Sequence, residues 1–102
     1  LGNTYEYKVS KTHSWSFQDI SEKVLKKYEK DEEIILAVVD KQNLVVTNIY
    51  SAVPQKVVTR LKQKLQEKEI RYARNGKKIR RKQAGLSKGD LIRVGAKKID
   101  FT

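Results

Sequence analysis

The segment EIILAVVD, residues 33–40, constrains the fold most strongly, because it holds the longest apolar run of the chain. That run, residues 34–39, is six residues long, whereas a helix that spans a bilayer needs about twenty. A strand exposed on one side would alternate apolar and polar residues, and this segment is apolar on both sides. It therefore predicts a central strand of a sheet. After a polar turn, LVVTNIY (residues 44–50) predicts the next strand.

The N-terminal part predicts a strand and then a helix. In TYEYKVS, residues 4–10, apolar and polar residues alternate with the period of a strand. Ser16 is a suitable helix N-cap, and Asp19 three residues later completes a capping-box pattern. One helical face then carries Phe17, Ile20, Val24, Leu25 and Tyr28. These spacings predict a structural helix that begins near Ser16.

A second helix is predicted to begin at Pro54, because proline suits the first turn of a helix. Its buried face would contain Val57, Leu61 and Leu65. Beside that face runs a stripe of cations spaced four residues apart, namely Lys56, Arg60, Lys64 and Lys68. The stripe fits either an anion-binding surface or a solvated helix flank whose lysine stems cover apolar surface.

The excess of positive charge lies entirely in the second half of the chain. Residues 1–51 contain 7 Lys and Arg against 8 Asp and Glu, whereas residues 52–102 contain 16 against 4. Such a one-sided field favours an anionic partner through electrostatic steering and counterion release. Nucleic acid is the first candidate, ahead of anionic membranes and acidic proteins. The chain has no cysteine, which fits a reducing compartment and a cytoplasmic location.

The densest part of this charge is RYARNGKKIRRK, residues 71–82, around the pair Asn75-Gly76. Asn-Gly between alternating segments predicts a two-residue β-hairpin turn, because both turn residues need positive φ. That register places Arg71 opposite Arg80, a like-charge pair that costs stability in a sheet. An external anion would offset this cost. Arginine suits phosphate, because its planar fork donates two parallel hydrogen bonds.

The stretch NGKKIRRKQAGLSKGDLIRV, residues 75–94, resembles the closing segment of the S-four type RNA-binding domain. In that family an Asn-Gly turn is followed by Gly-Asp and a final apolar strand. The matching positions are Asn75, Gly76, Gly89, Asp90, Leu91, Ile92 and Val94. The family's glycine before the Asn-Gly strand is replaced around Glu69 and Ile70, and its paired short helices are not visible. The same turn pattern is similar to the end of β-grasp domains, which do not bind nucleic acid as a class.

Few residues suggest catalysis. The single histidine, His13, and Glu6 of a Glu-x-Lys pattern are the two candidates, and neither has an identifiable catalytic partner. No metal-ligand spacing or Gly-rich phosphate loop is present, so no metal or cofactor is expected. A small ribonuclease or toxin-like nuclease remains the third hypothesis.

Together these patterns predict one α+β domain over residues 1–102, with a mixed or antiparallel sheet. Residues 4–50 and 51–95 would be two repeated helix-plus-β-hairpin units. The absence of methionine indicates a removed initiator or a piece of a longer protein.

The leading functional hypothesis is a non-catalytic nucleic-acid-binding protein, with RNA slightly favoured over DNA and no membrane partner. A protein-interaction module, with an acidic partner or strand addition at a sheet edge, is the second. The predicted phosphate contacts are Arg71, Arg74, Lys77, Lys78, Arg80, Arg81 and Lys82, extended by Arg60, Lys64 and Lys68.

Overall fold

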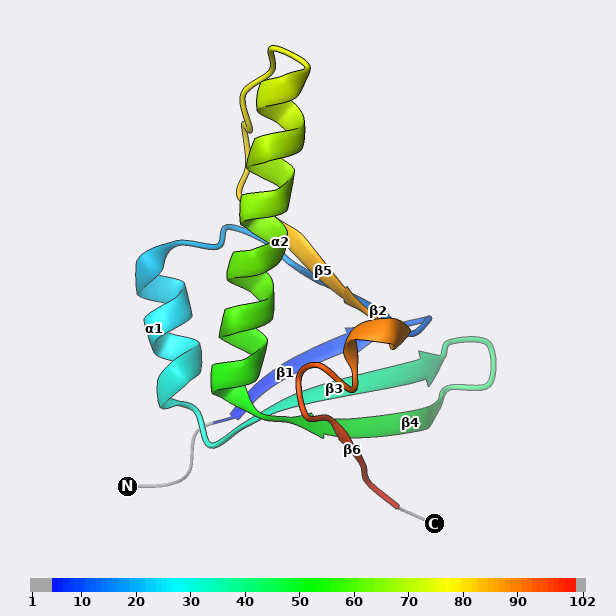
Figure 1. The fold of residues 1–102 in the computed structure, drawn as a ribbon. Coiled ribbons are helices and arrows are strands. Elements are labelled where there is room, and N and C mark those ends of the chain that lie inside the picture. Colours follow the sequence, from blue (N-terminus) through cyan, green and yellow to red (C-terminus); the bar gives the residue numbers. More distant parts are fainter. Residues whose placement is uncertain (1–4, 101–102) are drawn as a thin grey trace.

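Figure 1 shows the computed structural model of the protein, which describes residues 5–100. Its elements in chain order are β1 (Tyr5–Ser10), β2 (Ser14–Phe17), α1 (Glu22–Lys30), β3 (Glu33–Asp40), β4 (Val45–Ala52), α2 (Pro54–Arg74), β5 (Ala84–Ser87), the short 3-10 helix η1 (Lys88–Asp90) and β6 (Lys97–Lys98). The predicted α+β class is confirmed. Neither α-helix in residues 5–100 has the length and apolar character needed to cross a membrane.

The main sheet is mixed and has the strand order β1-β3-β4-β6. β1 and β3 are parallel, because α1 lies between them in the chain, whereas β3–β4 and β4–β6 are antiparallel. β3 is an inner strand, as its apolar sequence predicts, and Ile34, Leu36 and Val38 on one of its faces are buried. β2 and β5 form a separate two-stranded antiparallel sheet.

The core lies on one side of the main sheet, under α1, α2 and the β2–β5 pair (Figure 1). Trp15 and Phe17 of β2 are almost fully buried in it. The Trp15 indole Nε1 donates a hydrogen bond of 2.8 Å to the Ala37 carbonyl of β3. This bond satisfies the one polar atom of a large buried ring, and it ties the small sheet to the main one.

The first helix begins later than the sequence pattern predicts. α1 starts at Glu22, and the N-cap is Ser21, whose hydroxyl accepts a hydrogen bond from the Val24 amide. The prediction of a Ser16 cap was wrong, because Ser16 lies in β2 between two buried aromatic residues. That exposed-buried alternation has the period of a strand, and it outweighs the capping-box spacing around Asp19.

The second predicted hairpin does not form. α2 continues through residues 69–74 to Arg74, and Asn75-Gly76 ends the helix instead of turning between two strands. Of these two residues, Gly76 has positive φ and Asn75 does not. The Gly76 amide donates to the Ala73 carbonyl, and the Lys77 amide donates to the Tyr72 carbonyl. This pattern is a Schellman motif, in which glycine supplies the left-handed residue after a helix.

Other predictions for residues 71–94 also differ from the structure. Arg71 and Arg80 are not cross-strand neighbours, because Arg71 lies on a helix and residues 77–83 follow it without regular structure. The second helix-plus-β-hairpin unit is therefore absent, although the first is present as α1, β3 and β4. Residues 91–94 form turns and not the final strand that the S-four resemblance implies.

Candidate nucleic-acid interface

The predicted cations on α2 fall into two groups with different surroundings. In the first half of the helix, Arg60 Nε donates a hydrogen bond of 2.8 Å to Asp90 Oδ1. Lys64 Nζ contacts Asp90 Oδ2 and the Gly85 carbonyl oxygen. Both cations therefore join α2 to the β5–η1 segment, and they have an internal partner that the sequence analysis did not foresee.

Asp90 is the centre of this contact and is itself buried, with 3% of its surface exposed. Burial alone would raise the pKa of its carboxyl group. The hydrogen bonds from Lys64, the Ser87 amide, Arg60 and the Ser87 hydroxyl outweigh burial and hold that pKa well below its ordinary value. Asp90 is thus a carboxylate with satisfied oxygens, and the cluster is structural.

The sequence did contain a signal for this cluster. Ser87 and Asp90 have the Ser-x-x-acid spacing of a capping box, and the box is present in the structure. Arg60 and Lys64 are four residues apart and therefore share a helix face. What the sequence could not supply was the proximity of two segments 30 residues apart.

The second group of cations lies in residues 68–82, which we name the basic finger. All four buried residues of α2, Pro54, Val57, Val58 and Leu61, precede it. In Figure 1 the end of α2 extends beyond α1 and β5, and residues 77–83 run back beside it. The finger contains eight cations and one carboxylate, Glu69. Those cations are Lys68, Arg71, Arg74, Lys77, Lys78, Arg80, Arg81 and Lys82.

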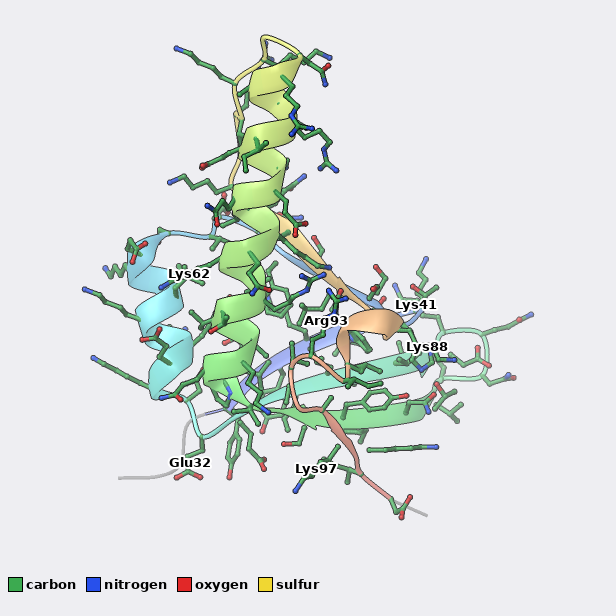
Figure 2. All side chains as sticks on the ribbon, viewed as in Figure 1. Glu32, Lys41, Lys62, Lys88, Arg93 and Lys97 are labelled. Atoms are coloured by element: carbon green, nitrogen blue, oxygen red, sulfur yellow. The ribbon has the colours of Figure 1, made fainter. Side chains whose placement is uncertain are left out.

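No cation of the basic finger forms an ion pair within the described range 5–100. The three ion pairs found there are Lys8–Glu6 and the two with Asp90. Except for half-buried Lys68, the eight cations are exposed (Figure 2). Arg71 and Arg74 gain some stability from the negative end of the helix dipole, because they lie in the last turn. Lys68 lies by the Tyr72 ring, and the remaining five cations form no ion pair with any residue that the structure describes.

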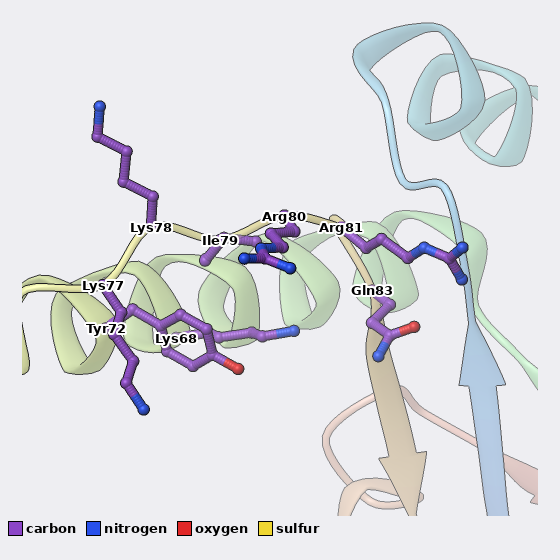
Figure 3. Close-up of a pocket in the computed structure, with 8 residues that line it drawn as sticks. All are labelled: Lys68, Tyr72, Lys77, Lys78, Ile79, Arg80, Arg81 and Gln83. Atoms are coloured by element: carbon purple, nitrogen blue, oxygen red, sulfur yellow. The ribbon is translucent and has the colours of Figure 1, made fainter.

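A groove runs between α2 and the returning segment, and Figure 3 shows its lining. Its volume is about 720 Å³. The Lys68 Nζ lies 5.5 Å from the centre of the half-buried Tyr72 ring. The lining residues are Lys68, Tyr72, Lys77, Lys78, Ile79, Arg80, Arg81 and Gln83. An open groove with one aromatic ring and several cations suits a phosphate chain that carries planar bases.

The neighbouring hollow extends this positive surface toward the body of the protein. Arg71 lines it together with Lys64, Lys68 and Gly85. All eight predicted contacts of the basic finger therefore lie on or beside one protruding element. Arg81 and Lys82 lie where the segment rejoins the body. The amide of Ile20 donates 2.8 Å to the Lys82 carbonyl and anchors that end.

The two catalytic candidates have structural partners. His13 Nε2 lies 3.1 Å from the Tyr50 hydroxyl, and its ring makes edge contacts with Trp15 and Tyr50. Glu6 pairs with Lys8 at 3.9 Å. Among residues 5–100 no group of three His, Asp or Glu side chains is arranged to hold a metal ion.

Comparison with known proteins gives no family. No protein-family model matches the chain, and no match was found among curated proteins or among solved structures. Function must therefore be argued from the geometry and charge of this chain.

Proposed function

We propose that the protein is a non-catalytic nucleic-acid-binding domain that holds phosphates with its basic finger. One observation carries the proposal: the finger places eight cations on a protruding element, and none of them has a carboxylate partner among the described residues. Folding offsets the mutual repulsion of these cations only in part. A polyanion would offset the rest and would gain free energy by releasing its counterions.

The proposed contacts are the cations of the finger, without the two that hold Asp90. Arg60 and Lys64 are engaged inside the protein, so we leave them out of the phosphate-binding set. The hairpin geometry is replaced by a helix end and a returning segment, and the groove between them would follow a phosphate backbone. Most of this binding would depend on charge and shape, because contacts to phosphate carry no sequence information.

RNA remains the first ligand to test, with single strands ahead of duplexes. Tyr72 and the arginines around the groove offer flat faces on which unpaired bases can stack. A duplex would instead meet the finger through its backbone alone. The expected order of affinity is therefore single-stranded RNA, single-stranded DNA and then the duplexes at equal salt.

The test is a fluorescence-anisotropy titration of labelled single- and double-stranded RNA and DNA across a range of salt. If about five phosphates are neutralised, log affinity falls with log salt at a slope of roughly −3.5 to −4.5. A slope near zero would overturn the proposal. The same probes, inspected on a gel, test the nuclease hypothesis, because cleavage that disappears in His13→Ala would support it.

A matched pair of variants separates the finger from net charge. The first replaces Arg71, Arg74, Arg80 and Arg81 with Gln. The control replaces Lys23, Lys26, Lys27 and Lys30 of α1, which are also exposed, with Gln. Both variants lose four positive charges, and only the first should lose binding. Equal losses would mean that affinity follows total charge and not the finger.

A protein-interaction role is the second candidate, and a separate observation favours it. The face of the main sheet that points away from the helices is apolar and exposed.

A cytoplasmic location stays a prediction.

A further inference from the structure

The main sheet has one face without helices. Strand pairing assigns side chains to this open face, because residues alternate between the two faces and paired residues share one. Tyr7 is paired with Ile35, Ile35 with Ser51, and Ser51 with Lys97. The apolar members of the open face are Tyr5, Tyr7, Val9, Ile35, Ala37, Val39, Val46, Ile49 and Ile99.

The open face is exposed and contiguous over four strands. Tyr7 and Val9 are each 64% exposed, although they lie on an ordered strand beside the core strand β3. In Figure 1 both helices and the β2–β5 pair lie on the opposite side of the sheet. Isolated exposed apolar residues are ordinary, but a contiguous apolar patch of this kind marks an interaction site.

Charged residues border the open face on two different sides. Glu33 lies on β3, beside the edge strand β1, whereas Lys97 lies on β6 at the other edge of the sheet. Figure 2 shows Glu32 and Lys97 projecting on the side of the sheet away from the helices. The middle of the face is uncharged. The face therefore carries a carboxylate on the β1–β3 side and a cation at the β6 edge.

This arrangement is complementary to itself. Rotation by a half turn about an axis parallel to the strands lays the β1 side of one sheet over the β6 side of an identical one. Glu33 of one protomer, on β3, then faces the β4–β6 side of its partner, where Lys97 lies, and the apolar centres meet. Two stacked sheets with nearly aligned strands are an ordinary packing arrangement in proteins.

Charge also argues against other occupants. Among the residues that strand pairing assigns to the open face, one is a carboxylate, Glu33, and one is a cation, Lys97. An anionic membrane or an acidic protein would prefer the finger, which extends away from the sheet (Figure 1). Two copies of a chain with net charge +11 repel each other least through this nearly neutral face.

We propose that the open face is the interface of a homodimer, in which two main sheets pack face to face. Both basic fingers remain exposed on the outside of this dimer. The proposal is therefore independent of nucleic-acid binding and stands or falls separately.

The test is sedimentation velocity of the 102-residue chain over micromolar to millimolar concentration at 0.15 M salt. The wild type should be dimeric. Tyr7→Lys combined with Val9→Lys should be monomeric and still folded by circular dichroism, because both side chains are mostly exposed in the monomer. The matched control is Ile92→Lys combined with Ile70→Lys, two exposed apolar residues outside the four strands of the main sheet. This control should remain a dimer.

A charge exchange tests the orientation without disturbing the apolar centre. Glu33→Lys should weaken the dimer by about tenfold, as expected for a like-charge contact, and adding Lys97→Glu should restore it. A wild type that is monomeric at every concentration would overturn the proposal. A dimer that is unaffected by the Tyr7 and Val9 changes would also overturn it. So would a monomeric protein that co-sediments with neutral lipid vesicles, because the face would then bind lipid and not a second copy.

Discussion

Both halves of α2 carry several cations, and these cations have different surroundings. In the first half, Arg60 and Lys64 hold a buried carboxylate, and the helix packs on the core through Val57 and Leu61. In the second half, the cations face solvent, and the helix end is accompanied only by the returning segment. The first half contributes to the fold, and the second is available to a partner.

The comparison shows that helical spacing alone does not identify a binding surface. Arg60, Lys64 and Lys68 follow one another at intervals of four residues. Two of them contact Asp90, and the third lies by Tyr72 in the finger groove. Their partners, and not their periodicity, separate a structural cation from one that an external anion would neutralise.

The largest expected effect is on stability and concerns Asp90, the partner of Arg60 and Lys64 in the first half of α2. Asp90→Asn should lower the free energy of unfolding by about 3 kcal/mol, because the half-buried Arg60 and Lys64 lose the carboxylate that compensates their charge. Urea denaturation followed by circular dichroism measures it. The control is Glu67→Gln. Glu67 is an exposed carboxylate on α2, and its replacement should change stability very little. A loss for Asp90→Asn as small as the control would show that the cluster is not structural.

The same carboxylate predicts a pH dependence. The folded-state pKa of Asp90 is lowered from its ordinary value of 3.8, so its contribution is fully present above that pH. It is lost as the pH falls below 3.8 toward the folded-state pKa. The stability difference between wild type and Asp90→Asn should therefore be constant from pH 5 to pH 7, about one unit or more above the ordinary value, and should narrow in more acidic solution. A difference that stays constant down to the lowest pH measured would contradict this assignment.

The second effect concerns affinity, in the second half of the helix and the returning segment. Replacing Arg71, Arg74, Arg80 and Arg81 with Gln should weaken nucleic-acid binding by about a hundredfold and reduce the salt slope by about 3. The free energy of unfolding should fall by about 1 kcal/mol at most, because Arg71 and Arg74 lose only their interaction with the helix dipole and these side chains have no ion pair among the described residues. Anisotropy and urea titrations on the same samples give both numbers. A variant that loses stability and keeps its affinity would reverse the roles of the two halves.

Local patterns predicted the elements whose partners are near in sequence or whose faces are unambiguous. The apolar segment 33–40 became the inner strand β3, and Pro54 became the start of α2. The fold class followed from these elements. The site was predicted as a set of charges, because the concentration of Lys and Arg is visible in the sequence itself.

The errors have a common physical origin: the same short sequence pattern is compatible with two different local structures. Asn-Gly suits a hairpin turn, and Gly after Asn also ends a helix, so only the preceding residues decide. Residues 69–74 contain Glu, Arg and Ala, which favour a helix, and the helix continued through them. The exposed side of Tyr7 and Val9 was equally ambiguous, because alternation shows that two faces differ but not which one the helices cover.

The smallest expected effect concerns Gly76, at the tip of the basic finger where α2 ends and the chain turns back. Gly76 has a φ of 68°, and no atom lies near the position of an added Cβ, so Gly76→Ala would cost only backbone strain. That strain should lower stability by about 1 kcal/mol. It should speed hydrogen exchange of the Lys77 amide, which donates to the Tyr72 carbonyl. Gly76→Asn should cost less, since asparagine tolerates the left-handed conformation. Gly89→Ala, where the added Cβ meets only Ser87 Oγ at 3.8 Å, is the neutral control. If Gly76→Ala were equally neutral, the helix cap would not be what shapes the finger.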